Sequence, residues 1–437
     1  MNYKDVNIRQ FVTPAVYVLR LLVGAVFVLS GFAKAIDPWG TVYKLADYVG
    51  ILHLESFAPL VTFGAFALPV VETVLGVFIL LGLYRRFAPI LLTAMMAVMT
   101  LLTFYLAVTD RMADCGCFGE VIVLSNWATF MKNVVLMAAS IVLLKYNRRA
   151  KNVYGVGVQW VVWALTMMFT MMIEYYGYVY QPMLDFRPFK VGTKLYEGPA
   201  EGDCDADDKF VFIYQKDGVE REFKLDSLPD DTWEYVDRRV ADGAEVPAVK
   251  HVAVFDGGFD VTAEVLNPAS EQLIFTFPDM EDISISFTYL INELNELAQK
   301  LGVSTFGVSS GSAAQIEEWN DISMAQYPMY EMDDTDMKIL ARGNPAVVYV
   351  KNGTIVWKRA LRSISSERVQ APNADMTSIV ADFDASYRLR VLLAGYGTLM
   401  FLLLMVNRIH RVVKFTLKRI RKNGKKEVTL QQENEEL

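Results

Sequence analysis

The sequence predicts a multi-pass membrane protein in which an all-α helical bundle carries an α/β domain outside the membrane. Hydrophobic residues make up 53% of the 437 residues, and they are concentrated in six apolar runs. Strand-like and helix-like stretches alternate in the long polar segment between the fifth and sixth runs. Each run approaches the ~20 residues that a helix needs to cross the ~30 Å hydrocarbon core of a bilayer. The runs cover residues 17–36, 60–83, 87–108, 127–144, 158–178 and 391–406.

The first four runs are joined by short connections, which favour an antiparallel four-helix bundle over residues 1–150. A fifth helix over residues 151–180 leads out of the membrane, and a sixth over residues 387–410 returns to it. Residues 411–437 then form a basic tail.

The placement of lysine and arginine predicts the orientation, because these residues are enriched in cytoplasmic loops. They follow the second, fourth and sixth runs, and all three groups agree on one arrangement. Both termini are then cytoplasmic, and the loops 37–59 and 109–126 and the segment 181–386 are periplasmic, in a bacterial inner membrane. The same rule accounts for the basic tail, so nucleic acid is not an expected partner.

The segment outside the membrane divides into two parts. Residues 181–245 form a small strand-rich segment, in which Asp217-Gly218 marks the turn of a hairpin. Residues 246–386 combine strand-like runs with a helix-period run at 286–301 and a second hairpin around Asn352-Gly353. This alternation favours an α/β domain with a mixed sheet.

Two of the three cysteines, Cys115 and Cys117, stand one residue apart in a short loop between the third and fourth runs. Such a pair can cycle between dithiol and disulfide, which would make it the catalytic centre of an oxidoreductase. A static disulfide and two inert thiols are the alternatives, because the carboxylates of Asp114 and Glu120 raise thiol pKa values. Cys204 is either a resolving thiol for this pair or a lone thiol. The three histidines are scattered, and no metal site is predicted.

Charged side chains inside apolar runs are costly and often functional. Counted from the ends of their runs, Arg20 and Glu72 lie at similar depths, so we expect them to pair inside the bundle. In the alternative, Arg20 reaches the cytoplasmic interface and Glu72 is protonated. Lys34 and Lys132 lie near the outer ends of their runs. Lys132 is placed either to stabilise a thiolate or a quinone oxygen, or to anchor its helix at the interface.

Three stretches carry a family resemblance: Ser30-Gly31-Phe32-Ala33-Lys34-Ala35-Ile36-Asp37-Pro38, Pro69-Val70-Val71-Glu72 and the Cys115-Gly116-Cys117-Phe118-Gly119 loop. With them, residues 10–148 resemble membrane proteins of the DoxX and MauE type. The resemblance implies a four-helix membrane domain. MauE-like proteins are associated with disulfide formation in exported methylamine dehydrogenase, and DoxX-like proteins with sulfur-compound and quinone redox. Nothing in this sequence indicates methylamine chemistry, so that substrate is not carried over.

In the outer segment, Asn344-Pro345-Ala346-Val347-Val348 and the later Asn352-Gly353 resemble the cis-proline strand and following hairpin of thioredoxin-like proteins of the TlpA or peroxiredoxin kind. The resemblance implies a thioredoxin-like domain over residues 246–386, with a cis peptide bond before Pro345. Where that family carries its cysteine pair, this chain reads Pro278-Asp279-Met280-Glu281-Asp282. A domain without these cysteines cannot exchange disulfides itself, and its expected role is docking.

These observations predict a membrane component of an extracytoplasmic thiol–disulfide redox system, as an oxidoreductase subunit with Cys115 and Cys117 as the redox pair. Quinone is the candidate cofactor, because it can approach a loop at the edge of the bilayer. The expected partners are membrane lipid and either an exported thiol protein or a separate thioredoxin-like protein. The alternative is a non-enzymatic envelope scaffold that binds a partner protein through its redox-inactive domain.

Overall fold

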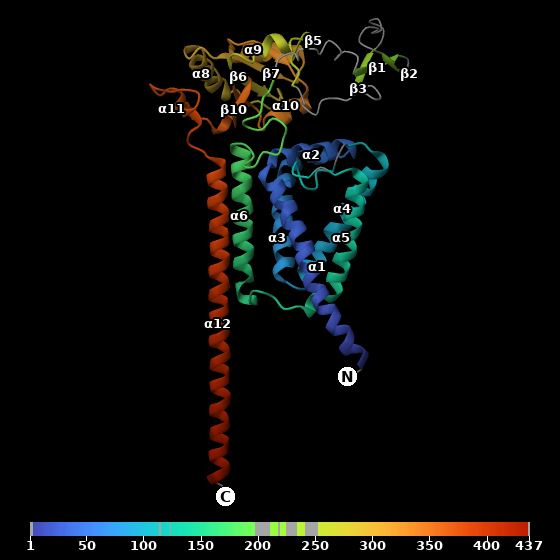
Figure 1. Ribbon diagram of the computed structural model, residues 1–437, viewed down its shortest axis with the longest axis vertical. Helices are drawn as coiled ribbons and strands as arrows, with labels where there is room; N and C mark the ends of the chain where they lie inside the picture. Colours follow the sequence, from blue (N-terminus) through green and yellow to red (C-terminus); the bar gives the residue numbers. More distant parts are fainter. Residues whose placement is uncertain are drawn as a thin grey trace. The chain divides into compact units, whose positions relative to one another are not determined.

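The computed structural model describes residues 3–112, 115–122, 124–196, 210–216, 219–223, 234–240 and 252–435. The chain forms two compact units (Figure 1). The first, here called the helical unit, combines Met1–Phe186 with Ala381–Leu437. The second, here called the sheet unit, is Arg187–Val380.

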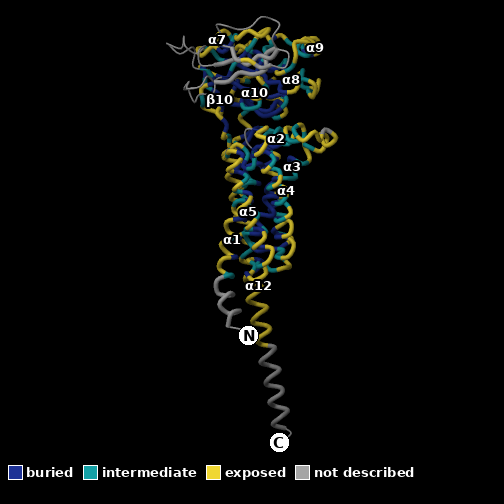
Figure 2. The backbone as a smooth tube through the Cα atoms, turned by 90° about the vertical axis from the view of Figure 1, so that its right-hand side faces the viewer, coloured by how far each residue is buried: buried dark blue, intermediate teal, exposed yellow. Residues whose placement is uncertain are grey.

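Within the described residues, six helices of the helical unit are long and apolar enough to cross a membrane, which confirms the prediction of a multi-pass membrane protein. Figure 2 shows exposed residues along these helices, and many of them are large and apolar, as expected for surfaces that contact lipid. The helices are α1 (Tyr3–Ile36), α3 (Val61–Leu81), α4 (Phe87–Thr109), α5 (Asn126–Tyr146), α6 (Gln159–Val179) and α12 (Ala385–Glu435).

The sequence predicts only a loop between the first two spans, yet a helix, α2 (Pro38–Ile51), stands there. Asp37 caps it, because its carboxylate accepts a hydrogen bond from the backbone N–H of Gly40 at 3.0 Å. Pro38 occupies the first turn, where its missing N–H has no intrahelical partner to lose. α2 lies across one end of the bundle formed by α1, α3, α4 and α5 (Figure 1).

Glycines set the register between α1 and α3, which pack closely and antiparallel. A Cβ added to Gly24 would lie 2.8 Å from the backbone nitrogen of Leu80, and one added to Gly31 would lie 2.6 Å from that of Thr73. Membrane helices approach this closely where small residues line their interface. Gly24 is therefore level with Leu80, and Gly31 is level with Thr73.

Replacing Gly31 with alanine is expected to destabilise the helical unit by about 1–3 kcal/mol, as at other overpacked sites. The added methyl group would meet backbone atoms of Thr73, which cannot move unless the two helices separate. Gly50→Ala, in α2, is the matched control, because a Cβ there meets nothing within 4 Å. Thermal unfolding in detergent measures both variants, and equal midpoints would contradict the close packing at Gly31.

The last helix, α12, is 51 residues long and continues to Glu435, through the region expected to be a short span and a separate tail. It packs on α6, where the rings of Phe169 and Tyr396 stack with their centroids 4.4 Å apart. Tyr180, just after α6, and Phe383, just before α12, stack at 3.9 Å. The two segments that lead to the sheet unit therefore leave the helical unit side by side.

Seven strands form the mixed sheet of the sheet unit: β4 (Phe255–Asp256), β5 (Phe259–Asp260), β6 (Glu271–Phe277), β7 (Ser304–Ser309), β8 (Met329–Glu331), β9 (Ala346–Lys351) and β10 (Thr354–Ala360). Their order is β10-β9-β6-β7-β8-β4-β5. β6, β7 and β8 run parallel, while β9 is antiparallel to both β6 and β10. The prediction of an α/β region with a mixed sheet is confirmed.

Helices cover both faces of this sheet: α7 (Thr262–Val265), α8 (Phe287–Lys300), α9 (Ala313–Ser323), α10 (Asp334–Leu340) and α11 (Ser366–Val369). Side chains alternate along β6, so that Phe275 and Phe277 lie on one face and Ile274 lies on the other. α8, α9 and α11 contribute to the core on the Phe275 face, and α10 contributes to the core on the Ile274 face. The peptide bond between Asn344 and Pro345 is cis, the isomer expected there.

A second, smaller sheet has three antiparallel strands in the order β2-β1-β3. They are β1 (Phe210–Lys216), β2 (Val219–Phe223) and β3 (Glu234–Val240). β1 and β2 pair as the hairpin that the Asp-Gly signal predicts. β3 pairs with β1 on its other side, and no pattern in the sequence predicts it.

Candidate functional site

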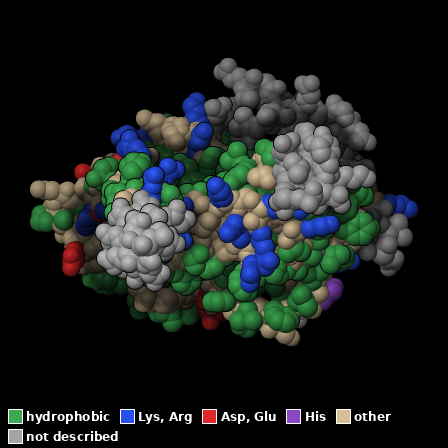
Figure 3. Space-filling model, turned by 90° about the horizontal axis from the view of Figure 1, so that it is seen from below, with side chains coloured by type: hydrophobic (Ala, Val, Ile, Leu, Met, Phe, Trp, Pro, Cys, Tyr) green, Lys and Arg blue, Asp and Glu red, His purple; other side chains and the backbone are tan. Residues whose placement is uncertain are grey.

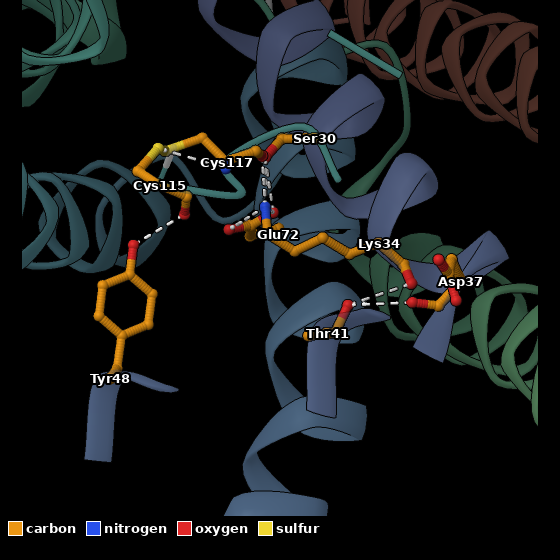
Figure 4. Close-up of polar contacts among 8 residues, drawn as sticks. All are labelled: Ser30, Lys34, Asp37, Thr41, Tyr48, Glu72, Cys115 and Cys117. Carbon is orange, nitrogen blue, oxygen red and sulfur yellow. Dashed lines mark hydrogen bonds and ion pairs between the residues drawn. A yellow bond between two sulfur atoms is a disulfide. The ribbon is translucent and has the colours of Figure 1, made fainter. Parts of the chain in front are cut away.

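Cys115 and Cys117 form a disulfide in the loop between α4 and α5, with their Cα atoms 5.5 Å apart (Figure 4). Gly116 and Gly119 have positive φ angles of 62° and 54°, which glycine adopts without the steric cost of a Cβ. The N–H of Gly119 donates to the carbonyl of Gly116 at 3.0 Å, so the residues after the first cysteine form a tight turn. The glycines thus let the chain bring the two sulfurs together.

Side chains of α1 and α2 bind both cysteines through their backbone carbonyls. The Tyr48 hydroxyl, from α2, donates to the carbonyl of Cys115 at 2.8 Å. Lys34 and Ser30, one turn apart on α1, lie 2.5 and 2.7 Å from the carbonyl oxygen of Cys117 (Figure 4). The loop is therefore fixed by α1 and α2, in addition to the two helices that it joins.

A buried ion pair lies next to the loop. The Lys34 ammonium is 2.9 and 3.2 Å from the two carboxylate oxygens of Glu72, and only 7% and 5% of these residues are exposed. The Ser30 hydroxyl lies 2.8 Å from both the Lys34 ammonium and Glu72 Oε2. A buried ion pair is stable only when further hydrogen bonds satisfy its partners, and Ser30 and the Cys117 carbonyl supply them. The one hydroxyl proton of Ser30 can point to Glu72 or to Cys117, so this side chain connects the carboxylate to the loop.

The predicted pair between Arg20 and Glu72 is wrong, because the partner of Glu72 is Lys34. The register between α1 and α3 places Glu72 level with the turn of α1 that precedes Lys34. At a rise of 1.5 Å per residue, that turn lies about 18 Å along α1 from Arg20. In the same register the last residue of α1, Ile36, is level with Leu68, so the first turns of α3 lie beyond the end of α1. Depths counted from the ends of the two runs therefore do not correspond.

Arg20 instead holds the turn after α5. Its guanidinium donates to Asn147 Oδ1 at 2.6 Å, and to the carbonyls of Asn147 and Lys151 at 2.5 and 2.9 Å. Carbonyls at the end of a helix lack intrahelical partners, and a cation there is favoured by the helix dipole. Arg20 is only 2% exposed, and its role is to fix the end of the bundle opposite the cysteine loop.

A cavity of about 420 Å³ lies within the bundle and borders the disulfide. Natural ligand pockets have volumes of roughly 300–1,000 Å³. Cys115, Cys117 and the ion pair line the cavity toward the loop, whereas methionines of α4 line it deeper in the bundle. The cavity therefore combines a large apolar wall with a small group of polar and redox-capable side chains.

Lys132, from α5, also lines this cavity. Its ammonium lies 4.4 Å from the centroid of the Phe118 ring, in the cysteine loop. It makes no hydrogen bond or ion pair with any residue that the structure describes. Lys34, in contrast, has its donors directed to Glu72, Ser30 and the Cys117 carbonyl. Lys132 is thus the cation whose donors remain for a ligand.

The structure brings five of the sequence-predicted site residues together around one cavity: Lys34, Glu72, Cys115, Cys117 and Lys132. Arg20 lies at the other end of the bundle, and Asp114 and Cys204 lie outside the described residues. The sequence analysis does not predict Ser30 and Tyr48 as site residues, because their side chains are uncharged. Ser30 stands four residues before Lys34 on the same helix, a spacing that places both on one face.

Comparisons with known proteins agree with a membrane protein of this type. Residues 209–241 match a domain family of unknown function, DUF8463. No curated protein and no solved structure matches the chain. Residues 12–146, which hold most of α1, all of α2 to α5 and every residue around the cavity, match the family described as methylamine utilisation protein MauE. Over about a third of its length, the chain is therefore similar to MauE-type membrane proteins.

Proposed function

We propose that this protein is a membrane component of an extracytoplasmic thiol–disulfide redox system, with Cys115 and Cys117 as the redox pair. The observation that carries the proposal is the position of the disulfide. Side chains of neighbouring helices donate hydrogen bonds to the backbone carbonyls of its loop, and the loop borders a cavity that is also lined by a buried ion pair. A disulfide that only closed the loop would need neither the cavity nor the buried charges. The similarity to the MauE family supports a redox or electron-transfer role.

The proposed step is thiol–disulfide exchange. A thiolate of an exported protein attacks one sulfur of the Cys115–Cys117 disulfide, whose S–S bond breaks as a mixed disulfide forms. A second thiolate of the exported protein then attacks the mixed disulfide. The exported protein leaves oxidised, and Cys115 and Cys117 are left reduced by two electrons.

In this proposal the cysteine loop and residues 181–386 are periplasmic, and both termini are cytoplasmic, in a bacterial inner membrane. The end of the bundle opposite the loop supports this orientation, because exposed Arg86, Lys145 and Arg148 lie there. Figure 3 shows lysine and arginine side chains gathered on the face at that end, with few acidic ones. Cytoplasmic loops favour such residues, and the periplasm permits disulfides.

We also propose that the sheet unit has a thioredoxin-like fold that lacks the redox cysteines of that family. Its support is the strand order β10-β9-β6-β7, with β6 and β7 parallel and joined through α8, and β9 antiparallel to β6. After β6, the carbonyl of Asp279 accepts a hydrogen bond from the Asn344 amide at 2.7 Å. The loop at 278–282, where such a fold would carry cysteines, is thus held next to Pro345, and we assign the unit a docking role.

The second candidate function is a non-enzymatic scaffold that anchors a partner protein in the envelope. The cysteine-free loop at 278–282 favours it, because a docking domain alone needs no redox chemistry. In that case the Cys115–Cys117 disulfide would be static.

The redox state of Cys115 and Cys117 in whole cells distinguishes the two candidates. Thiols are trapped with a maleimide after acid quenching, before and after a brief dithiothreitol pulse, in a Cys204→Ser background. We expect a disulfide that the pulse reduces and that re-forms within minutes, as an exchanging pair does. A pair that stays in one redox state throughout would contradict the redox role and would favour the scaffold function.

A further inference from the structure

We propose that residues 408–420, where α12 leaves the bundle, lie along the membrane surface and bind the headgroups of anionic phospholipids. Because these residues lie outside the part of the chain that matches the MauE family, the proposed redox function does not bear on them. The surface in question is the one at the end of the bundle opposite the cysteine loop. In the proposed orientation, that surface faces the cytoplasm.

Asn407 marks the point at which α12 leaves the bundle. It is the last buried residue among the described side chains of α12, and its Oδ1 atom accepts a hydrogen bond from the N–H of Gly155 at 3.1 Å. Gly155 belongs to the connection between α5 and α6, which also carries exposed Arg148 and Lys151. Basic residues gather at the headgroup level, so this connection marks the edge of the hydrocarbon core. Every residue from 408 to 420 is exposed (Figure 2).

The part of α12 before this point already has the length of a membrane span. Leu389 is buried against Met183 and Phe383 near the start of the helix. Asn407 lies about 27 Å further along at 1.5 Å per residue, which is close to the ~30 Å thickness of the hydrocarbon core. The apolar side chains of residues 408–420 are therefore not needed to cross the bilayer.

Residues 408–420 form an amphipathic helix. At about 100° per residue, five apolar side chains fall on one side of it, and each of them is at least half exposed: Ile409, Val412, Val413, Leu417 and Ile420. Five basic side chains fall on the other side: Arg408, Arg411, Lys414, Lys418 and Arg419. This segment contains no aspartate or glutamate, and Phe415 is the one large apolar residue on the basic side.

The two faces together select a membrane surface as the partner. Apolar side chains that project into water are unfavourable, and a bilayer covers them when an amphipathic helix lies in the plane of the interface. The long basic side chains then reach the phosphate groups of anionic lipids beside the helix. The rule that places lysine and arginine in cytoplasmic segments explains the basic residues, but it does not account for the apolar face.

Charge argues against a second copy of the chain as the partner of the apolar face. In a parallel pair of helices, Arg408, Lys414 and Arg419 of each chain would flank the contact, and like charges repel. A nucleic acid would bind the basic face through its phosphates and would leave the apolar face in water. A bilayer with anionic lipid is the partner that satisfies both faces.

Binding to the surface requires α12 to bend where it leaves the bundle. The hydrogen bond with Gly155 fixes Asn407, whereas residues 408–420 are exposed on all sides. A bend just after Asn407 therefore breaks no buried contact among the described residues, and it turns the apolar face onto the bilayer.

Spin labels on the two faces test this arrangement. The full chain carrying Cys204→Ser, with the Cys115–Cys117 disulfide intact, has no free thiol, and a nitroxide is attached to Val413→Cys or to Phe415→Cys. Each protein is placed in nanodiscs of phosphatidylcholine with or without phosphatidylglycerol. Collisions with oxygen report lipid, and collisions with a nickel chelate report water. With phosphatidylglycerol, we expect oxygen to dominate for the label at 413 and nickel for the label at 415.

Polar substitutions on each face give a matched comparison, read from the label at 413. Leu417→Gln, on the apolar face, is expected to lower the ratio of oxygen to nickel collisions several-fold. Phe415→Gln, on the basic face, should leave this ratio unchanged. The unfolding midpoints of both proteins should equal that of the parent, because residues 408–420 lie outside the packed bundle.

Neutral substitutions of the basic residues test the lipid headgroup. Arg411→Gln, Lys414→Gln and Lys418→Gln in one protein are expected to weaken surface binding roughly a hundredfold, since each charge near an anionic surface contributes about fivefold. The exchange of lysine for arginine and of arginine for lysine at the same three positions keeps the charge and should keep the binding. Added salt should weaken binding in the parent protein.

Three outcomes would overturn the proposal. If nickel dominates at both positions in nanodiscs with phosphatidylglycerol, the helix stands free in water. If the label at 413 is shielded from both reagents and broadened by a second label, the partner is another copy of the chain. If the label at 413 is equally immersed with and without phosphatidylglycerol, anionic headgroups are not recognised.

Discussion

Replacing Cys117 with serine is expected to lower thiol oxidation by this protein roughly a thousandfold or more, as when a covalent catalytic group is removed. Without the second sulfur no internal disulfide can form, so an incoming thiolate has no S–S bond to attack. Cys115→Ser should have the same effect. The measurement is the oxidation of a synthetic dithiol peptide by membranes that contain each variant at equal amounts, and Cys204→Ser is the matched control, expected to retain activity.

A deletion of residues 187–380 completes this experiment. In the redox protein, the serine variants and the deletion each impair the oxidation of exported proteins in cells, but only the serine variants abolish oxidation of the small peptide. If the protein is instead a non-enzymatic scaffold, only the deletion has a phenotype. Wild-type peptide oxidation by Cys115→Ser and Cys117→Ser membranes would therefore contradict the role assigned to the cysteine pair.

Lys34→Met is expected to have the second largest effect, because it removes the partner of a buried carboxylate and one of the two groups bound to the Cys117 carbonyl. Leaving one member of a buried ion pair unpaired costs about 3–5 kcal/mol if the remaining group stays charged. The loop should then open more often, so that dithiothreitol reduces the Cys115–Cys117 disulfide faster. Thermal unfolding and the reduction rate, both in detergent, measure the two consequences.

Two further variants separate charge from packing at this position. Lys34→Met combined with Glu72→Met removes both charges and should recover most of the stability, while the disulfide stays easy to reduce. Lys145→Met removes an exposed lysine near the end of α5 and should change stability by less than about 0.5 kcal/mol. A Lys34→Met protein with an unchanged midpoint and reduction rate would show that the ion pair does not hold the loop.

Much of the fold follows from the sequence, because it depends on local patterns. The six apolar runs have the length that a bilayer requires, and the β1–β2 hairpin and the alternating strands of the sheet unit have clear turn signals. The helix α2 escaped prediction although Asp37 and Pro38 form a recognisable start signal. Its apolar residues are too few for a span, and the surrounding segment reads as a connection.

The contacts between the site residues could not be predicted from such local patterns. Lys34, Glu72 and Lys132 stand out individually, since charged side chains are rare in membrane spans, and Cys115 and Cys117 stand out because the chain has only three cysteines. Which of them meet depends on the relative height of α1 and α3, and that height is set by the contacts of Gly24 and Gly31 with the facing backbone. A glycine in an apolar run does not reveal its partner, so the wrong cation was paired with Glu72.

The stacked rings of Tyr180 and Phe383 have a consequence for how this protein could have arisen. They keep the end of α6 beside the start of α12, and both rings belong to the helical unit. Bridging two ends that are already adjacent needs only a short linker, and its entropic cost rises slowly with length. The junction therefore behaves as an insertion point, at which one extramembrane module can be exchanged for another while the bundle and its cysteine loop stay unaltered.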